Sequence, residues 1–231
     1  MYQKKSQKII TRFLLNGVLL VGASNLQAFE FHIGPRIGLG LGTVIGIKGV
    51  GKDAKAVIDV PLGLLTQFEF DKLGIEVGLN YHYRGYLFTD KEDTDGDTIK
   101  DKQTSLLGTS LLELPVTAYY QLRTTNGYWK FGGGLAFEYG IGKVKYRYED
   151  DGLDVDLSQT STYSELGLKP YDVLAIAQTG YQFKFTSWDL ALNLQFKYAL
   201  INKLKSGSQI GTSGAGTWHT FLTELGVAFL F

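Results

Sequence analysis

The chain has 231 residues, with 23 lysines and arginines against 23 aspartates and glutamates, and no cysteine. This balanced charge lacks the basic excess with which nucleic-acid-binding proteins neutralise phosphates, so we expect no nucleic-acid partner. Without cysteine the chain can form no disulfide, thiolate zinc site or cysteine nucleophile. A single all-β domain fits this length.

The first 28 residues have the pattern of a secretory signal peptide. An apolar run at 13–21 is preceded by four basic residues, Lys4, Lys5, Lys8 and Arg12. The run is shorter than the roughly 20 apolar residues that a spanning helix needs, so a retained membrane anchor is the weaker alternative. We expect cleavage after Ala28, which would leave 29–231 as the mature domain with 19 basic against 23 acidic residues.

From Phe29 onward, apolar and polar residues alternate with a period of two, which predicts strands with two different faces. At 188–200, for example, the even positions are all aromatic or Leu, whereas the odd positions are polar or Ala. Strands are expected at 29–40, 57–70, 73–88, 106–122, 128–144, 170–185, 188–200 and 217–231.

The connections between these eight strands alternate in length. Tight turns are expected at 71–72, 123–127 and 186–187, and long connections at 41–56, 89–105, 145–169 and 201–216. Short turns on one side and long loops on the other are typical of bacterial outer-membrane barrels. The sequence therefore predicts an all-β, eight-stranded antiparallel up-and-down transmembrane β-barrel in the bacterial outer membrane.

A soluble lipocalin-like barrel is the rival architecture, with its apolar faces turned inward around a ligand. Aromatic residues weigh against it, because they gather near both ends of the predicted strands, as in the girdles at membrane interfaces. The polar faces are also rich in Gly and Ala and thin in Lys and Glu, which suits a crowded interior better than a surface in water.

An eight-stranded barrel is just wide enough for side chains to fill its interior. Strand parity places inside it the acids Glu30, Glu69, Glu76, Glu113, Glu138, Asp172, Asp189 and Glu224, the bases Arg36, Arg84, Lys130, Lys184 and Lys197, and His32 and His82. One unpartnered buried charge would cost several kcal/mol, so we expect interleaved ion pairs that plug the lumen. A diffusion porin needs about 16 to 18 strands, so general porin activity is not expected.

Two segments carry a resemblance to a known family. LLELPVTAYY at 111–120 and YWKFGGGLAFEYGIG at 128–142 resemble the fourth and fifth strands of PorT-like outer-membrane β-barrel proteins. The closing VAFLF resembles the C-terminal signal that the outer-membrane assembly machinery reads during insertion. The resemblance implies an eight-stranded barrel and transfers no catalytic residue.

One predicted loop has the composition of a calcium site. In DTDGDTIKD, the carboxylates of Asp93, Asp95, Asp97 and Asp101 could wrap around one Ca²⁺, with Gly96 allowing a tight bend. The string resembles the calcium repeats of thrombospondin type 3 modules, and it lacks the glycine and glutamate positions of an EF-hand. The alternative is a solvated acidic loop.

No catalytic residue is expected. Small outer-membrane barrels include lipid-modifying enzymes that use His and Ser, but the position two residues after His219 is Phe221. We therefore expect a structural or surface-interaction role, carried by the long loops toward an unidentified extracellular ligand, in contact with outer-membrane lipid. A lipid-modifying enzyme and a soluble ligand carrier are the alternatives.

Overall fold

The computed structural model describes residues 29–45, 53–92, 101–150, 155–205 and 217–231. The expected signal peptide at 1–28 lies outside these residues and stays a prediction. The described strands are β1 (Phe29–Ile45), β2 (Asp53–Phe70), β3 (Leu73–Glu92), β4 (Asp101–Thr124), β5 (Gly127–Asp150), β6 (Val155–Ser161), β7 (Tyr171–Lys184), β8 (Asp189–Ala199) and β9 (His219–Leu230).

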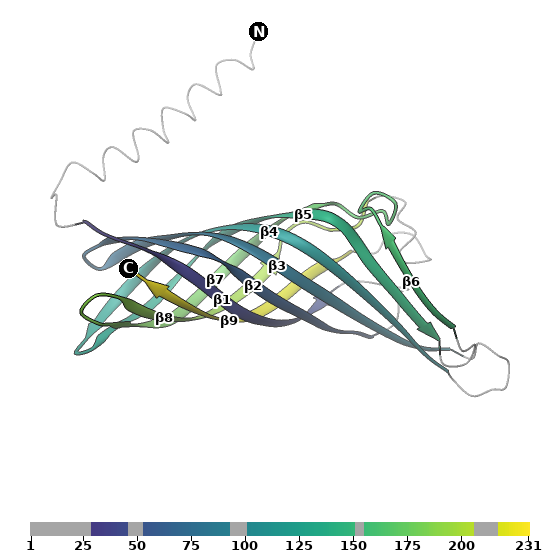
Figure 1. Ribbon diagram of the computed structural model, residues 1–231, viewed down its shortest axis with the longest axis horizontal. Helices are drawn as coiled ribbons and strands as arrows, with labels where there is room; N and C mark the ends of the chain where they lie inside the picture. The colour runs from purple at the N-terminus through teal and green to yellow at the C-terminus, as the bar shows by residue number, and fades with distance from the viewer. Residues whose placement is uncertain (1–28, 46–52, 93–100, 151–154, 206–216) are drawn as a thin grey trace, which may run out of the picture.

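Eight of these strands close into a barrel (Figure 1). Consecutive barrel strands pair antiparallel, β1 also pairs with β9, and β4 pairs with β5, so the ring runs through β1 to β5 and β7 to β9. Tight connections lie at one end, which also holds the C-terminus, and we call this the inner end. The predicted closed eight-stranded antiparallel barrel is confirmed.

Each of the predicted tight turns is present. Asp71 adopts a positive φ of 52° between β2 and β3, a conformation that Asp tolerates better than most residues. Thr125 and Asn126 form the two-residue loop of the β4–β5 hairpin, and Gly127, the first residue of β5, pairs with Thr124. Residues 185–188 connect β7 to β8.

At the opposite end, which we call the outer end, the predicted bounds of the long connections are wrong, because strands continue into them. β3 continues to Glu92, β4 already begins at Asp101, and β5 continues to Asp150. The stretch 145–169, expected as a loop, contains the end of β5 and a further strand, β6, which pairs with β5 from Val144 to Asp150. These extensions keep their ladder pairing. The sequence is polar throughout at 89–92 and 101–105, whereas β5 beyond Ile141 still alternates, with Lys143 and Lys145 exposed and Val144 buried.

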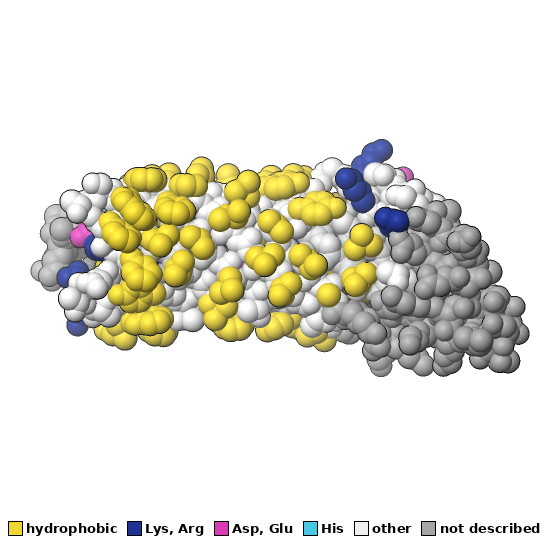
Figure 2. Space-filling model, turned by 60° about the horizontal axis from the view of Figure 1, so that its bottom comes forward, with side chains coloured by type: hydrophobic (Ala, Val, Ile, Leu, Met, Phe, Trp, Pro, Cys, Tyr) yellow, Lys and Arg dark blue, Asp and Glu magenta, His cyan; other side chains and the backbone are white. Residues whose placement is uncertain are grey.

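The barrel is apolar outside and charged inside. Leu225, for example, is 64% exposed, whereas Glu113 and Lys197 are fully buried. Figure 2 shows apolar side chains in a band along the barrel, with Lys and Arg confined to its two ends on this face. Such a surface matches a hydrocarbon environment. The lipocalin-like alternative, which needs apolar side chains inside the barrel and polar ones outside, is wrong.

Aromatic side chains face outward near both ends of the band. Trp129 and Phe131 stack near the inner end, and Trp129 meets Tyr181 edge to face. Tyr81 and Tyr139 are exposed farther along the barrel. These positions fit the expected interface girdles. Among the described residues, no helix is long and apolar enough to cross a membrane.

Apolar side chains also fill the outer end of the lumen, which sequence analysis did not predict. This outer apolar cluster consists of Val44, Val57, Tyr86, Phe88, Leu107, Val144, Tyr163, Leu168, Leu204, Trp218 and Leu222. The rings of Tyr86 and Phe88 meet Trp218 edge to face, with centroids 5.2 and 5.5 Å away. Inward positions therefore change from charged to apolar toward the outer end.

A self-capped turn at 162–168 contributes to this cluster. The backbone N–H of Thr162 donates to Glu165 (2.7 Å), and the N–H of Glu165 donates back to the Thr162 hydroxyl (3.3 Å), a capping-box exchange that holds the pKa of Glu165 below its usual value. Gly167, at φ 65°, ends the turn, and the N–H of Leu168 donates to the carbonyl of Tyr163 (2.7 Å). Tyr163 and Leu168 are thereby held in the cluster.

Candidate functional site

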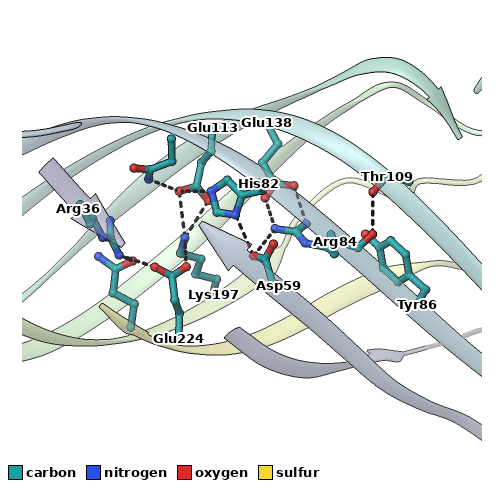
Figure 3. Close-up of polar contacts among 12 residues, drawn as sticks. Arg36, Asp59, His82, Arg84, Tyr86, Thr109, Glu113, Glu138, Lys197 and Glu224 are labelled. Atoms are coloured by element: carbon teal, nitrogen blue, oxygen red, sulfur yellow. Dashed lines mark hydrogen bonds and ion pairs between the residues drawn. The ribbon is translucent and has the colours of Figure 1, made fainter. Parts of the chain in front are cut away.

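A chain of charged side chains occupies the middle of the lumen (Figure 3). The period of two along each strand points these side chains inward, and none is more than 2% exposed. We call them the central network: Arg36 of β1, Asp59 of β2, His82 and Arg84 of β3, Glu113 of β4, Glu138 of β5, Lys197 of β8 and Glu224 of β9.

The first half of the central network alternates cation and anion. Arg36 forms an ion pair with Glu224. Lys197 Nζ lies 2.7 Å from Glu224 Oε2 and donates to both oxygens of Glu113, at 2.9 and 2.8 Å. Asn80 adds a hydrogen bond to Glu113 (3.0 Å). The interleaving of acids and bases that sequence analysis expected is present here.

His82 joins this half to the second. Its Nδ1 lies 2.9 Å from Asp59 Oδ2, and its Nε2 lies 3.3 Å from Glu113 Oε1. With a proton on each ring nitrogen, His82 can donate toward both carboxylates. A doubly protonated His82 also balances the network, because four carboxylates otherwise face only two arginines and one lysine.

Arg84 ends the chain by holding two carboxylates. Its guanidinium donates to Asp59 Oδ2 at 3.0 Å and to both oxygens of Glu138, at 2.9 and 2.6 Å. Two parallel N–H···O bonds of this kind fix geometry as well as charge. The central network thus ties seven of the eight barrel strands together across the lumen.

A second cluster, centred on Glu76, lies next to the central network. Glu76 pairs with Lys130 (3.1 Å) and accepts hydrogen bonds from Gln67 (2.9 Å) and Gln178 (3.0 Å). Gln195 donates to Gln178 (2.9 Å) and accepts from Arg36 (3.0 Å). This last link makes the lumen contacts continuous from Glu76 to Glu138.

Two predicted interior residues lie instead at the inner rim. Glu30 and Lys184 pair at 2.8 Å, but their side chains are 48% and 39% exposed. They sit at strand ends, where parity no longer guarantees burial because the lumen opens. Glu69, the ladder partner of Glu30 on β2, is by contrast buried and accepts hydrogen bonds from the hydroxyls of Tyr119 and Tyr128, at 3.3 and 3.0 Å.

The remaining predicted interior acids are buried as expected. Asp189 accepts a hydrogen bond from Gln182 (2.6 Å), and Asp172 accepts one from the backbone of Val173 (2.8 Å). His32 lies 3.7 Å from Glu30 near the rim.

Sequence reasoning missed two charged residues of the lumen. Asp59 shares its strand parity with Glu69, so the alternation in β2 could have placed it inside. Lys203 lies four residues beyond the end of β8, where no periodic pattern exists. It is buried in the outer apolar cluster, with its Nζ 3.3 Å from the hydroxyl of Tyr86.

Two groups of side chains have the composition of a metal site. Asp59, His82 and Glu224 present ligand atoms within 4.8 Å of one another, as do Glu30, His32 and Glu69. In the buried group, however, Arg84 holds Asp59 and Lys197 holds Glu224, so these carboxylates already have cationic partners. A metal ion would have to displace them.

The predicted calcium ligands Asp93, Asp95 and Asp97 lie outside the described residues. Asp101 is the first residue of β4 and pairs with Glu92 in the ladder. The calcium site therefore stays a prediction. His219, at the start of β9, donates from Nδ1 to the carbonyl oxygen of Ala199 (2.9 Å) and stacks on the ring of Tyr198.

The sequence matches the family model described as outer membrane protein beta-barrel domain over residues 23–205. The chain belongs to this family. Together with the closed barrel and its apolar exterior, this places the protein in the bacterial outer membrane. No curated protein matched the sequence.

Several solved structures are similar to this family member. Ail, the attachment invasion locus protein of Yersinia pestis, solved with the heparin analogue sucrose octasulfate, is 13% identical, with 87% of this chain and 99% of Ail covered and a TM-score of 0.37. Neisserial surface protein A is 12% identical, with coverages of 87% and 98% and a TM-score of 0.37. The translocator domain of the autotransporter NalP from Neisseria meningitidis is 10% identical, with 97% of each chain covered and a TM-score of 0.29.

Proposed function

We propose that this outer-membrane barrel has a closed lumen and acts through its outer end, in a structural or surface-interaction role without catalysis. The central network is the observation that carries the proposal. Opening a path through the lumen would separate buried ion pairs, and leaving a buried charge without its partner costs about 3 to 5 kcal/mol.

Two further features support a closed lumen. The Glu76 cluster continues the hydrogen-bonded contacts toward the inner end, and the outer apolar cluster fills the lumen on the other side of Arg84. A barrel of eight strands leaves room for little more than its own side chains.

The outer end is the proposed place of interaction, since binding residues concentrate on surface connections held by a rigid scaffold. The ligand there is an extracellular molecule of unidentified class, and the outward apolar band contacts outer-membrane lipid. The resemblance of 111–120 to PorT-like proteins fits this role. The aromatic C-terminus at Phe231 fits recognition by the assembly machinery during insertion.

Conductance across a planar lipid bilayer tests the closed lumen. We expect the inserted protein to give no stable current steps, whereas Glu113→Ala combined with Lys197→Ala removes a buried pair and produces steps. Glu30→Ala combined with Lys184→Ala is the matched control, because it also removes one ion pair, at 2.8 Å, but at the inner rim where both side chains are partly exposed. Steady current through the unmodified protein would overturn the proposal.

The alternative of a lipid-modifying enzyme predicts that His219→Ala alters the lipid A profile of the cells. We expect an unchanged profile, because the described contacts of His219 are a backbone carbonyl and the Tyr198 ring. Calorimetric titration with Ca²⁺ tests the proposed loop site, and absence of heat would remove it.

A further inference from the structure

The outward face of β5 changes abruptly from apolar to cationic. From Trp129 to Tyr139 its outward positions are aromatic or aliphatic and exposed, apart from Gly133. Beyond Ile141 the same face carries Lys143, Lys145 and Arg147, all exposed. We call these three residues the cationic strip.

The strip lies at the outer border of the membrane-facing band. Below it, β5 pairs with β7 up to Tyr139, which is part of the closed barrel, whereas at Val144 and beyond β5 pairs with β6 instead. The strip therefore begins where β5 leaves the barrel wall. Figure 2 shows Lys and Arg side chains gathered just past the outer end of the apolar band.

Two residues with hydroxyl groups lie beside Lys145. Thr160 of β6 pairs with Lys145 and is exposed. On the other side, Lys145 pairs with Gly108 of β4, and the hydroxyl of Tyr83 lies where a side chain at Gly108 would be. These groups can donate to an anion that the lysines attract.

The charge of Glu165 interacts with that of Lys143. Glu165 is itself held by the backbone and hydroxyl of Thr162. Arg147 makes a further contact of its own. The two lysines therefore carry the attraction for an external anion.

An apolar column lies directly below the lysines. It consists of Phe137 and Tyr139 on β5 and of their ladder partners Leu114 and Leu112 on β4, all outward and exposed. Cations above exposed aromatic and aliphatic side chains match a lipid that carries phosphate on its headgroup and several acyl chains.

We propose that the cationic strip and this column form a binding site for a phosphorylated glycolipid of the outer leaflet. Lys143 and Lys145 bind the headgroup phosphate, with hydroxyls of Thr160 and Tyr83 beside it, and the acyl chains pack along the column. The site would anchor the outer half of β5 to the membrane surface.

Binding of diphosphoryl lipid A to the purified full-length barrel in neutral detergent micelles tests the site. The test variant is Lys143→Gln combined with Lys145→Gln. A basic residue near an anionic lipid surface contributes about 1 kcal/mol, so we expect about 30-fold weaker binding, which is about 2 kcal/mol. Lys72→Gln combined with Arg123→Gln removes the same charge at exposed positions of the inner end and should leave binding unchanged.

Three further measurements separate the explanations. Lys143→Arg combined with Lys145→Arg should restore binding, and dephosphorylated lipid A should bind the unmodified protein about as weakly as lipid A binds the glutamine variant. Inorganic phosphate should compete poorly, because the column contributes to affinity. Equal binding by the glutamine variant, equal binding of dephosphorylated lipid A, or full displacement by millimolar phosphate would each overturn the proposal. A heat-dependent shift in SDS-gel mobility shows that each variant is folded.

Discussion

At the scale of single residues, Arg84 shows how this lumen tolerates charge. A buried ion is stable only when partners replace its water, and Arg84 has two of them, Asp59 and Glu138. Removing the guanidinium would leave both carboxylates buried, with Glu138 losing its two hydrogen bonds at once. The main effect of losing any residue of the central network is thus to leave its charged partners buried without a counter-charge.

We expect Arg84→Met to lower the free energy of unfolding by about 3 to 5 kcal/mol. Urea unfolding of the vesicle-inserted barrel, followed by tryptophan fluorescence, measures this difference. The control is Arg123→Met at the inner rim, where the side chain is 67% exposed and lies 3.9 Å from Asp71. That change should cost at most about 1 kcal/mol. Equal losses in the two variants would contradict the role given to the network.

Much of the lumen could be predicted at this scale, and its gaps have physical causes. Parity alone placed Glu113, Glu138 and Lys197 inside, because each lies in the middle of a strand with strict alternation. The same rule failed for Glu30 and Lys184, which lie where the barrel opens to water. It could not reach Lys203, whose burial depends on contacts with Tyr86 and the outer apolar cluster.

At the scale of elements, the membrane decides where sequence patterns are informative. Inside the band, a slip of one residue would turn apolar side chains into the lumen, so alternation is strict and eight strands could be predicted. β6 lies beyond the band, and its consecutive residues Ser158, Gln159 and Thr160 are all exposed, so both of its faces meet water. The strand β6 therefore has the sequence VDLSQTS, which carries no clear alternation, and it was expected as loop.

The turn at 162–168 provides an element-scale prediction. Gly167 has φ 65°, and a side chain in this left-handed region costs about 1 to 2 kcal/mol. We expect Gly167→Val to loosen the turn and to speed chymotryptic cleavage after Tyr163, which the turn keeps buried, in vesicle-inserted protein. At Gly85 a Cβ would meet no atom within 4 Å, so Gly85→Val is the matched control. Unchanged cleavage after the Gly167 substitution would show that the turn is held by other contacts.

At the scale of the whole molecule, the closure of the barrel and the orientation of its side chains toward lipid or lumen act together. Pairing of β1 with β9 and of β4 with β5 leaves no open edge in the barrel wall, which a hydrocarbon environment requires. The ion pairs then cross a lumen whose walls are already joined. This closure could be predicted from the sequence alone, because an even number of strands, joined alternately by short and long connections, brings the last strand beside the first.

The orientation of the barrel in the membrane follows from its short turns at one end and long connections at the other. Because the sequence has no cysteine, introduced cysteines allow a direct test. Short turns face the periplasm in this class of barrel, so the exposed residues Thr186 and Ser187 should lie inside and Ser158 and Thr160 of β6 outside. In intact cells, a bulky impermeant maleimide should label Ser158→Cys and Thr160→Cys. It should label Thr186→Cys and Ser187→Cys only after the outer membrane is permeabilised. The reverse pattern would invert the barrel and would place the cationic strip at the wrong leaflet for an outer-leaflet glycolipid.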